Sequence, residues 1–209
     1  MKRRILTEAS GSLVSAYLIK AIKESGNVSI ASDIDKNNHG FCLADDFIEM
    51  PPSNDPELWS KIEKKLIERK VDMVIPSFDE TLMGWSKRKE YFYKKGINIL
   101  ISHSDSLEIY LDKYEAFKFC KLHNVPTPKT SLSQEYKIVK PRFGRGGSGI
   151  YIGDEKKDMN NMISQEYIKG MEYGLDILND FSGNFIAVCA KRKIDMRAGE
   201  TDKCERQIG

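Results

Sequence analysis

The sequence predicts an α/β fold in two parts, a parallel sheet followed by a region of antiparallel strands. Up to about residue 101, strand patterns alternate with helix patterns, and such alternation gives parallel strands joined by right-handed crossovers. Beyond residue 124, short strand patterns follow one another without helices between them, which favours antiparallel hairpins. Because the pattern changes near residues 105–112, we expect one domain at residues 1–108 and a second at residues 109–209.

The first part is expected to contain five strands with helices between them. Apolar and β-branched runs place the strands at residues 4–7, 28–31, 47–50, 71–76 and 97–101. Helical spacing of apolar residues predicts one helix at residues 13–22 and another at residues 79–95, and residues 33–40 are expected to form a polar loop. Asp55 and Pro56 suit the N-cap and first position of a further helix. Its buried stripe is predicted to be Leu58, Ile62 and Leu66.

The second part begins with two helical pieces and continues mainly as strands. The helices are predicted at residues 107–111 and 113–123, and residues 182–184 are predicted to form a turn. The strands are predicted at residues 136–142, 150–152, 163–168, 172–179 and 185–196. The last strand, near residues 206–209, ends without an obvious partner. Such an exposed edge predicts mobility or dimerisation, so a homodimer is one expectation.

Composition excludes several classes of protein. The chain has 209 residues, of which 40% are hydrophobic and 31% charged, as in a globular protein with a real core. Its 33 basic and 31 acidic residues leave a net charge of +2. This near-balance does not indicate the excess of positive charge that binds nucleic acid or an anionic membrane. The N-terminal apolar run is too short for a signal peptide or a membrane helix. The four cysteines form no C-x-x-C pair, so reduced thiols in a cytoplasmic protein are the simplest expectation.

A glycine-rich loop at residues 140–149 is the sharpest local signal. It holds four glycines within six residues, beside Lys140, Arg142 and Arg145. Glycines let the backbone approach a ligand closely and turn successive N–H groups toward an anion. A strand rather than a helix is predicted after the loop, which disfavours a dinucleotide fingerprint. It also lacks the G-K-S/T of a Walker A loop and the H-R-D segment of a protein kinase. Taken alone, the segment is equally consistent with a glycine turn that binds nothing.

Further motifs follow the loop in a fixed order. Residues 164–176 read S-Q-E-Y-I-K-G-M-E-Y-G-L-D, residues 191–193 read K-R-K, and residues 197–203 read R-A-G-E-T-D-K. Together with Lys140-Pro141 and the glycine loop, this order resembles the ATP-grasp superfamily, and most of all the carbamoyl-phosphate-synthase-like branch of carboxylate–amine ligases. The first part resembles that family's Rossmann-like pre-ATP-grasp domain. The resemblance therefore implies such a domain followed by an incomplete ATP-grasp domain.

The resemblance also implies particular residues for binding ATP. Lys113 and Lys140 would contact the nucleotide phosphates and the adenine face, and the loop of Gly146, Gly147, Ser148 and Gly149 would close over the β and γ phosphates. Glu166 would accept a hydrogen bond from the adenine amino group, with the backbone of Tyr167 and Ile168 along the ring edge. Glu172 would bind the ribose hydroxyls. Arg192 and Arg197 are the catalytic candidates, steadying transferred phosphate or a substrate carboxylate.

Simpler explanations exist for several of these residues. Glu166 and Glu172 alternate with apolar neighbours and could face solvent, and charges at residues 191–193 could protect a strand edge from aggregation. Lys113 is equally well explained as a surface lysine. Asp79 and Glu80 follow a buried strand and could line a substrate cleft, but acids at a helix N-terminus account for them more simply. No residue is assigned to a metal, and the three histidines are isolated in sequence.

The resemblance implies Mg²⁺ as well, held by carboxylates and an asparagine on strands beyond the last residue of this chain. We therefore expect a truncated form, a split-gene product or a remnant, inactive as it stands. The full protein is expected to bind ATP and a small carboxylate and to join the carboxylate to an amine or ammonia through an acyl phosphate. Two alternatives stay open: a non-catalytic module that binds a nucleotide or a small acid, and a structural α/β protein whose glycine loop is incidental.

Overall fold

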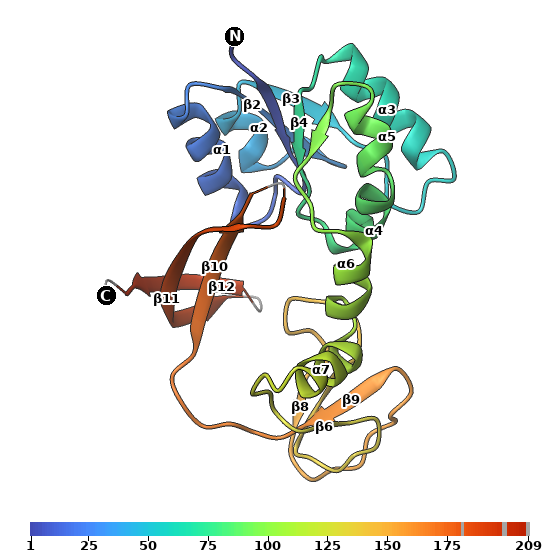
Figure 1. The fold of residues 1–209 in the computed structure, drawn as a ribbon, viewed down its shortest axis with the longest axis vertical. Coiled ribbons are helices and arrows are strands. Elements are labelled where there is room, and N and C mark those ends of the chain that lie inside the picture. The colour runs from blue at the N-terminus through green and yellow to red at the C-terminus, as the bar shows by residue number, and fades with distance from the viewer. Residues whose placement is uncertain (181, 198–199, 208–209) are drawn as a thin grey trace. The chain divides into compact units, whose positions relative to one another are not determined.

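The structure is a computed structural model, and it describes residues 1–180, 182–197 and 200–207. Its elements are shown in Figure 1. The chain divides into two compact units, residues 1–110 and residues 111–209. None of the helices that the structure describes has the length and the hydrophobicity that a membrane span requires.

The first unit is built on a five-stranded parallel sheet. Its strands are β1 (Arg4–Thr7), β2 (Val28–Asp33), β3 (Asp46–Glu49), β4 (Met73–Ile75) and β5 (Asn98–Ile99), in the order β3-β2-β1-β4-β5. Leu6 of the central strand β1 pairs with Ile30 of β2 and Val74 of β4. All neighbouring strands are parallel, which confirms the predicted parallel α/β architecture.

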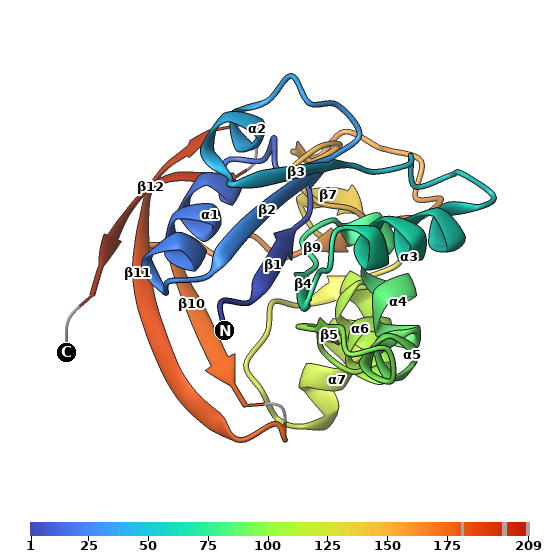
Figure 2. The ribbon, with the colours of Figure 1, turned by 90° about the horizontal axis from the view of Figure 1, so that it is seen from above.

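Helices cover both faces of this sheet. They are α1 (Ser15–Glu24), α2 (His39–Leu43), α3 (Leu58–Glu68), α4 (Asp79–Lys87) and α5 (Lys89–Tyr93). A further helix, α6 (Ser104–Tyr110), packs against α4 and buries none of its own residues. Figure 2 shows α1 and α2 on one side of the sheet and α3, α4 and α5 on the other. The second side holds the main core, where Leu6, Val74 and Trp85 are fully buried. The predicted stripe of α3 is confirmed, because Leu58, Ile62 and Leu66 all join this core.

Two local differences from the prediction have tertiary causes. The expected polar loop leads into the short helix α2, which begins at His39 and is capped by Asn38. A side chain on Gly40 of this helix would lie 2.4 Å from Ser10. The helix expected at residues 79–95 is broken at Arg88, where φ is −108° and ψ is 4°. The Arg88 guanidinium lies 4.3 Å from the ring centroid of Trp59. These contacts come from distant residues, so local periodicity does not contain them.

The second unit begins with helix α7 (Lys113–Leu122) and a four-stranded antiparallel sheet. The strands are β6 (Thr130–Ser131), β7 (Ile138–Pro141), β8 (Tyr151–Ile152) and β9 (Met162–Gln165), in the order β6-β9-β7-β8. Val139 of β7 and Ile163 of β9 are buried. Strand β6 was not predicted, because its two residues do not stand in a longer apolar run.

A second antiparallel sheet follows, formed by β10 (Tyr173–Asn179), β11 (Phe185–Arg197) and β12 (Glu200–Arg206) in that order. The prediction that the last strand lacks a partner is wrong, because β12 pairs along β11, with Lys191 opposite Arg206. The predicted exposed edge is present, since β12 is the outer strand of this sheet. Most residues of β12 are charged, and residues 202–206 are exposed, as expected of a strand with solvent on both faces. The antiparallel architecture predicted for the second part is confirmed.

Candidate functional site

The glycine-rich loop joins β7 to β8 and has a backbone that only glycine adopts easily. Gly144, Gly146, Gly147 and Gly149 have φ values of 92°, 67°, 68° and 71°. Side chains other than glycine are strained in this left-handed region. Residues 143–150, including Ser148, are all exposed. The loop is therefore exposed, and its glycines have no side chains to keep a ligand from the backbone.

Two lysines lie at the base of this loop. Lys113 begins α7, and its backbone N–H donates to the carbonyl oxygen of Arg142 at 3.1 Å, while its Nζ donates to the carbonyl oxygen of Gly144 at 2.8 Å. Lys140 lies on β7, and its Nζ donates to Oε1 of Gln165 on β9 at 2.6 Å. Burial, and then the positive charge of Lys113, lower the pKa of Lys140. The fold thus concentrates positive charge beside the glycine loop.

Arg142 is held differently from these lysines. Asp112 is buried, caps α7 by accepting from the backbone N–H groups of Tyr114 and Glu115, and lies 2.6 Å from Nη2 of Arg142. Glu115 lies 3.3 Å from the same nitrogen. Two carboxylates therefore balance the charge of Arg142, so this arginine anchors α7 to the base of the loop. From the sequence, Arg142 was expected to add positive charge beside the loop.

The segment after β9 carries the predicted adenine-binding residues. The backbone N–H of Glu166 donates to the carbonyl oxygen of Lys129 at 2.9 Å, and Oε1 of Glu166 accepts from the N–H of Lys129 at 3.0 Å. Tyr167 and Ile168 are exposed and lie outside any strand. Among the residues that the structure describes, no backbone hydrogen bond engages these two residues. Their N–H and C=O groups are therefore not engaged by other backbone groups among the described residues.

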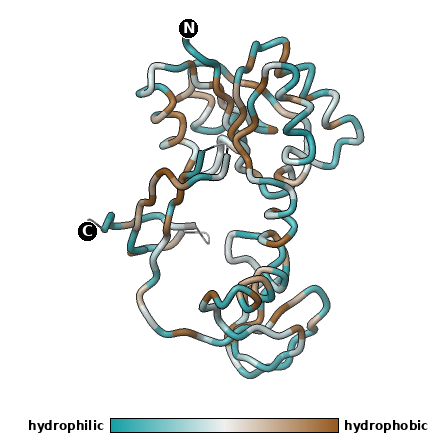
Figure 3. The backbone as a smooth tube through the Cα atoms, viewed as in Figure 1, coloured by the Kyte–Doolittle hydropathy of each residue, from teal (hydrophilic) through white to brown (hydrophobic). Residues whose placement is uncertain are grey.

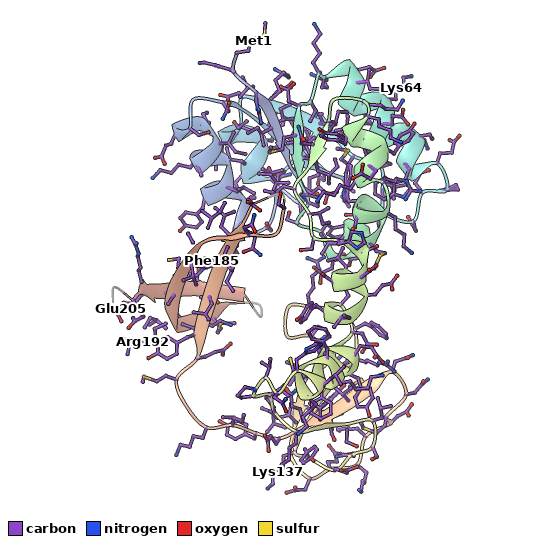
Figure 4. The ribbon with its side chains drawn as sticks, in the orientation of Figure 1. Met1, Lys64, Lys137, Phe185, Arg192 and Glu205 are labelled. Atoms are coloured by element: carbon purple, nitrogen blue, oxygen red, sulfur yellow. The ribbon has the colours of Figure 1, made fainter. Side chains whose placement is uncertain are left out.

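Glu172 and Arg192 lie together on the three-stranded sheet. Glu172 precedes β10 and forms an ion pair with Lys193, whose backbone N–H also donates to the carbonyl oxygen of Glu172 at 2.8 Å. Nη2 of Arg192 lies 2.7 Å from Oε2 of Glu205, a pair that can be followed in Figure 4. The Nε of Arg192 is buried and has no hydrogen-bond partner among the described residues. Arg197 ends β11, and its side chain lies outside the part of the chain that the structure describes.

These placements form two patches. One brings together Lys113, Lys140, the glycine loop and, through its neighbour Gln165, Glu166. The other is an open hollow in the three-stranded sheet whose lining includes Glu172 and Arg192. Across residues 1–180, 182–197 and 200–207, no group of three or more His, Cys, Asp or Glu side chains is arranged to hold a metal ion.

The second unit matches a known family over almost its whole length. Residues 110–206 match the family model described as the ATP-grasp domain. The second unit is an ATP-grasp domain. A comparison with curated protein sequences found no significant match.

Solved structures share the fold of the chain at low sequence identity. The L-amino acid ligase of Bacillus licheniformis is 13% identical, with a TM-score of 0.70, covering 100% of this chain and 56% of its own. The N5-carboxyaminoimidazole ribonucleotide synthetase of Thermotoga maritima is 18% identical, with a TM-score of 0.63, covering 90% of this chain and 53% of its own.

A third similar structure contains bound nucleotide. It is the biotin carboxylase domain of the Hydrogenobacter thermophilus 2-oxoglutarate carboxylase, in complex with ADP, magnesium ADP and bicarbonate. It is 18% identical, with a TM-score of 0.65, covering 96% of this chain and 52% of its own. The chain therefore spans about half the length of these three structures.

Two residues of the ATP-grasp domain contribute contacts that sequence reasoning missed. Gln165 holds the ammonium group of Lys140, and Asp112 ties α7 to Arg142. Gln165 lies inside the segment 164–176 quoted for the resemblance, and Asp112 directly precedes Lys113. A signal for Asp112 was therefore present, since an aspartate just before a helix is a favoured N-cap. The Lys140–Gln165 contact depends on the pairing of β7 with β9 and has no local signal.

Proposed function

We propose that the ATP-grasp domain binds ATP at the glycine loop, and that the whole protein is an ATP-dependent ligase that joins a carboxylate to an amine or ammonia. The observation that carries this proposal is the pair of lysines at the base of the loop. Among the described residues, no carboxylate pairs with Lys140, whose Nζ donates to the neutral amide of Gln165. Two ammonium groups held near each other cost electrostatic energy, which a polyphosphate would relieve.

The glycine loop would supply the second part of phosphate binding. Its N–H groups carry partial positive charge and approach a ligand without a side chain in the way. Ser148 adds a hydroxyl between Gly147 and Gly149. Loop amides and lysines would together hold the β and γ phosphates, with Gly146, Gly147, Ser148 and Gly149 covering them.

The base and sugar would be bound by the segment that follows β9. Tyr167 and Ile168 offer backbone N–H and C=O groups that are not used by other backbone groups among the described residues. Glu166 already accepts from Lys129 with Oε1, and a carboxylate has further lone pairs for an adenine amino group. Glu172 would bind the ribose hydroxyls, for which it would exchange its contact with Lys193.

The reaction would proceed in two displacements. A carboxylate oxygen of the substrate would attack the γ phosphorus of ATP, forming an acyl phosphate as the bond to ADP breaks. The amine nitrogen would then attack the acyl carbon, lose a proton, and release orthophosphate. Arg192 and Arg197 would neutralise the transferred phosphate or the carboxylate, since guanidinium groups bind both in bidentate fashion. The unpartnered Nε of Arg192 supports this assignment. No Mg²⁺ ligand is assigned within the described residues.

Titration calorimetry with ATP and Mg²⁺ tests the binding step. Lys140→Met should weaken ATP binding by about 10- to 100-fold, because a hydrogen bond to a charged group contributes about 1.5–3 kcal/mol and about 1.4 kcal/mol equals a factor of ten. Lys137→Met is the matched control: Lys137 stands just before β7, is largely exposed, and pairs with Asp154 at 3.4 Å. Absence of ATP binding to the wild-type chain, or equal losses in both variants, would contradict the proposal.

The chemical step needs a separate test on a longer polypeptide that continues beyond residue 209. Incubation with ATP, Mg²⁺ and a panel of small carboxylates in the presence of hydroxylamine traps an acyl phosphate as a hydroxamate. Hydroxamate that depends on one carboxylate supports the ligase. Tight ATP binding without hydroxamate for any carboxylate would instead support the non-catalytic nucleotide-binding module.

A further inference from the structure

The first unit contains a crevice that the ATP-binding proposal does not use. It opens where the chain leaves β1 and β2, with Glu8, Ala9 and Asp33 among its lining residues, and its volume is about 110 Å³. Most of its wall is apolar, formed by Ile34, Met50, Pro51, Leu58, Ile62 and Phe78. In open α/β sheets, ligands bind beyond the carboxyl ends of the strands, where the strand order reverses. Here the order reverses between β1 and β4, and Glu8, Phe78 and Thr81 of the lining follow these two strands.

Glu8 is the one strongly buried charged residue of this lining, with 7% of its surface exposed. Oε1 of its carboxylate accepts from Nε1 of Trp85 at 2.7 Å, and the hydroxyl of Thr81 lies 3.2 Å from both carboxylate oxygens. The backbone N–H of Ser77 donates to Oε2 at 3.3 Å. All these donors are neutral. Desolvation by burial outweighs them and raises the pKa of Glu8.

The charge of the crevice has one sign. Asp33 is the second carboxylate of the lining, and its Oδ2 accepts from the N–H of Gly11 at 2.9 Å. The lining contains no lysine, arginine or histidine. The loop after β1 holds Ala9 at a φ of 48°, a conformation that costs energy for a residue other than glycine. Such strain persists where the surrounding structure enforces it, and it often marks a ligand site.

We propose that this crevice binds a small organic cation, a primary ammonium compound with a short apolar chain. The ammonium group would lie against Glu8 and Asp33, where an opposite charge offsets the cost of burying a carboxylate. The apolar chain would lie against the wall that includes Ile34, Met50 and Phe78. A cavity of roughly 150 Å³ can hold benzene, so the smaller volume here suits a chain of a few carbons. Because the lining contains no cationic side chain, its charge disfavours anionic ligands.

This cation would be the amine that the proposed ligase consumes. That further assignment rests on the proposed function, whereas the binding itself does not. Binding of the cation involves residues of the first unit alone, and ATP binding involves residues of the second. The two proposals can therefore fail independently.

Nuclear magnetic resonance of the full chain tests the site with isobutylammonium as the probe and isobutanol as its neutral analogue. The chain has two tryptophans, so its spectrum contains two indole N–H signals, which a Trp59→Phe variant assigns. Because the indole of Trp85 donates to Glu8, its signal should shift saturably with isobutylammonium and more than that of Trp59. Glu8→Gln keeps the shape of the side chain and removes its charge, and should weaken this binding by about tenfold or more.

Glu49→Gln is the matched control, since Glu49 is exposed, ends β3 at the same edge of the sheet, and does not line the crevice. It should bind isobutylammonium as the wild type does. Asp33→Asn removes a less buried carboxylate and should weaken binding by a smaller factor, which keeps the test decisive if Glu8→Gln does not fold. No saturable shift in the wild type, equal affinity for isobutanol, or unchanged affinity in both charge-removing variants would overturn the proposal.

Discussion

Similar apolar residues are buried in the parallel sheet of the first unit and exposed in the three-stranded sheet of the second. Ile30 of β2 is fully buried, whereas Ile177 of β10 is 62% exposed. Figure 3 shows hydrophobic stretches in both sheets. Helices cover the first sheet, while Leu175, Phe185 and Val188 of the second remain exposed. An apolar strand pattern therefore predicts that a strand forms, but only its surroundings decide whether its side chains are buried.

The largest effect should come from the same substitution made in each sheet. Ile30→Ala should lower the free energy of unfolding by about 2–5 kcal/mol, through lost burial and the cavity left in the core. Ile177→Ala should change it by less than about 0.5 kcal/mol, because its side chain is already exposed. Urea denaturation followed by far-ultraviolet circular dichroism measures both. A comparable loss for Ile177→Ala would mean that another polypeptide surface covers this sheet in solution.

The same substitution of one glycine in each unit should give a smaller difference in stability. A methyl group on Gly84 of α4 would lie 2.0 Å from a ring carbon of Trp59, and Gly84→Ala should cost about 1–3 kcal/mol through overpacking. On Gly174 of β10 the nearest atom would be 4.0 Å away. Gly174→Ala should therefore be neutral or stabilise by up to about 1 kcal/mol. Thermal denaturation of the two variants checks this, and an equal loss in both would refute the packing difference.

The smallest effect should be a difference in pH dependence between the buried Glu8 of the first unit and the half-buried Lys140 of the second. The folded pKa of Glu8 is raised above its ordinary value of 4.5, so its folded carboxyl binds the proton more tightly. Wild-type stability relative to Glu8→Gln should be highest below pH 4.5 and should fall as the pH rises through the raised pKa. The folded pKa of Lys140 is lowered from 10.5. Stability relative to Lys140→Met should instead rise as the pH climbs from the lowered pKa toward 10.5.

Melting temperatures of the wild type, Glu8→Gln and Lys140→Met, measured in the acidic and the alkaline range, test these pH dependences. The Glu8 comparison should change only in the acidic range and the Lys140 comparison only in the alkaline range. Parallel curves for the wild type and a variant would show that burial does not perturb that group.

Local patterns were enough for most of the fold, because a helix or strand of several residues shows its own period. The five parallel strands, the stripe of α3 and the glycine loop all follow from residues close together in sequence. The elements that were missed are short or depend on distant contacts. Strand β6 has two residues, and the break at Arg88 accompanies its contact with Trp59.

The sequence by itself determined the chemical groups of the candidate site: a glycine loop, lysines beside it, and acids after β9. Only the tertiary structure decided how these groups are paired. It joins Lys140 to Gln165, Arg142 to Asp112 and Arg192 to Glu205, and it buries Glu8 in a crevice of the first unit. Sequence patterns record the residues of each strand and helix, whereas pairing and burial depend on which segments the fold brings side by side.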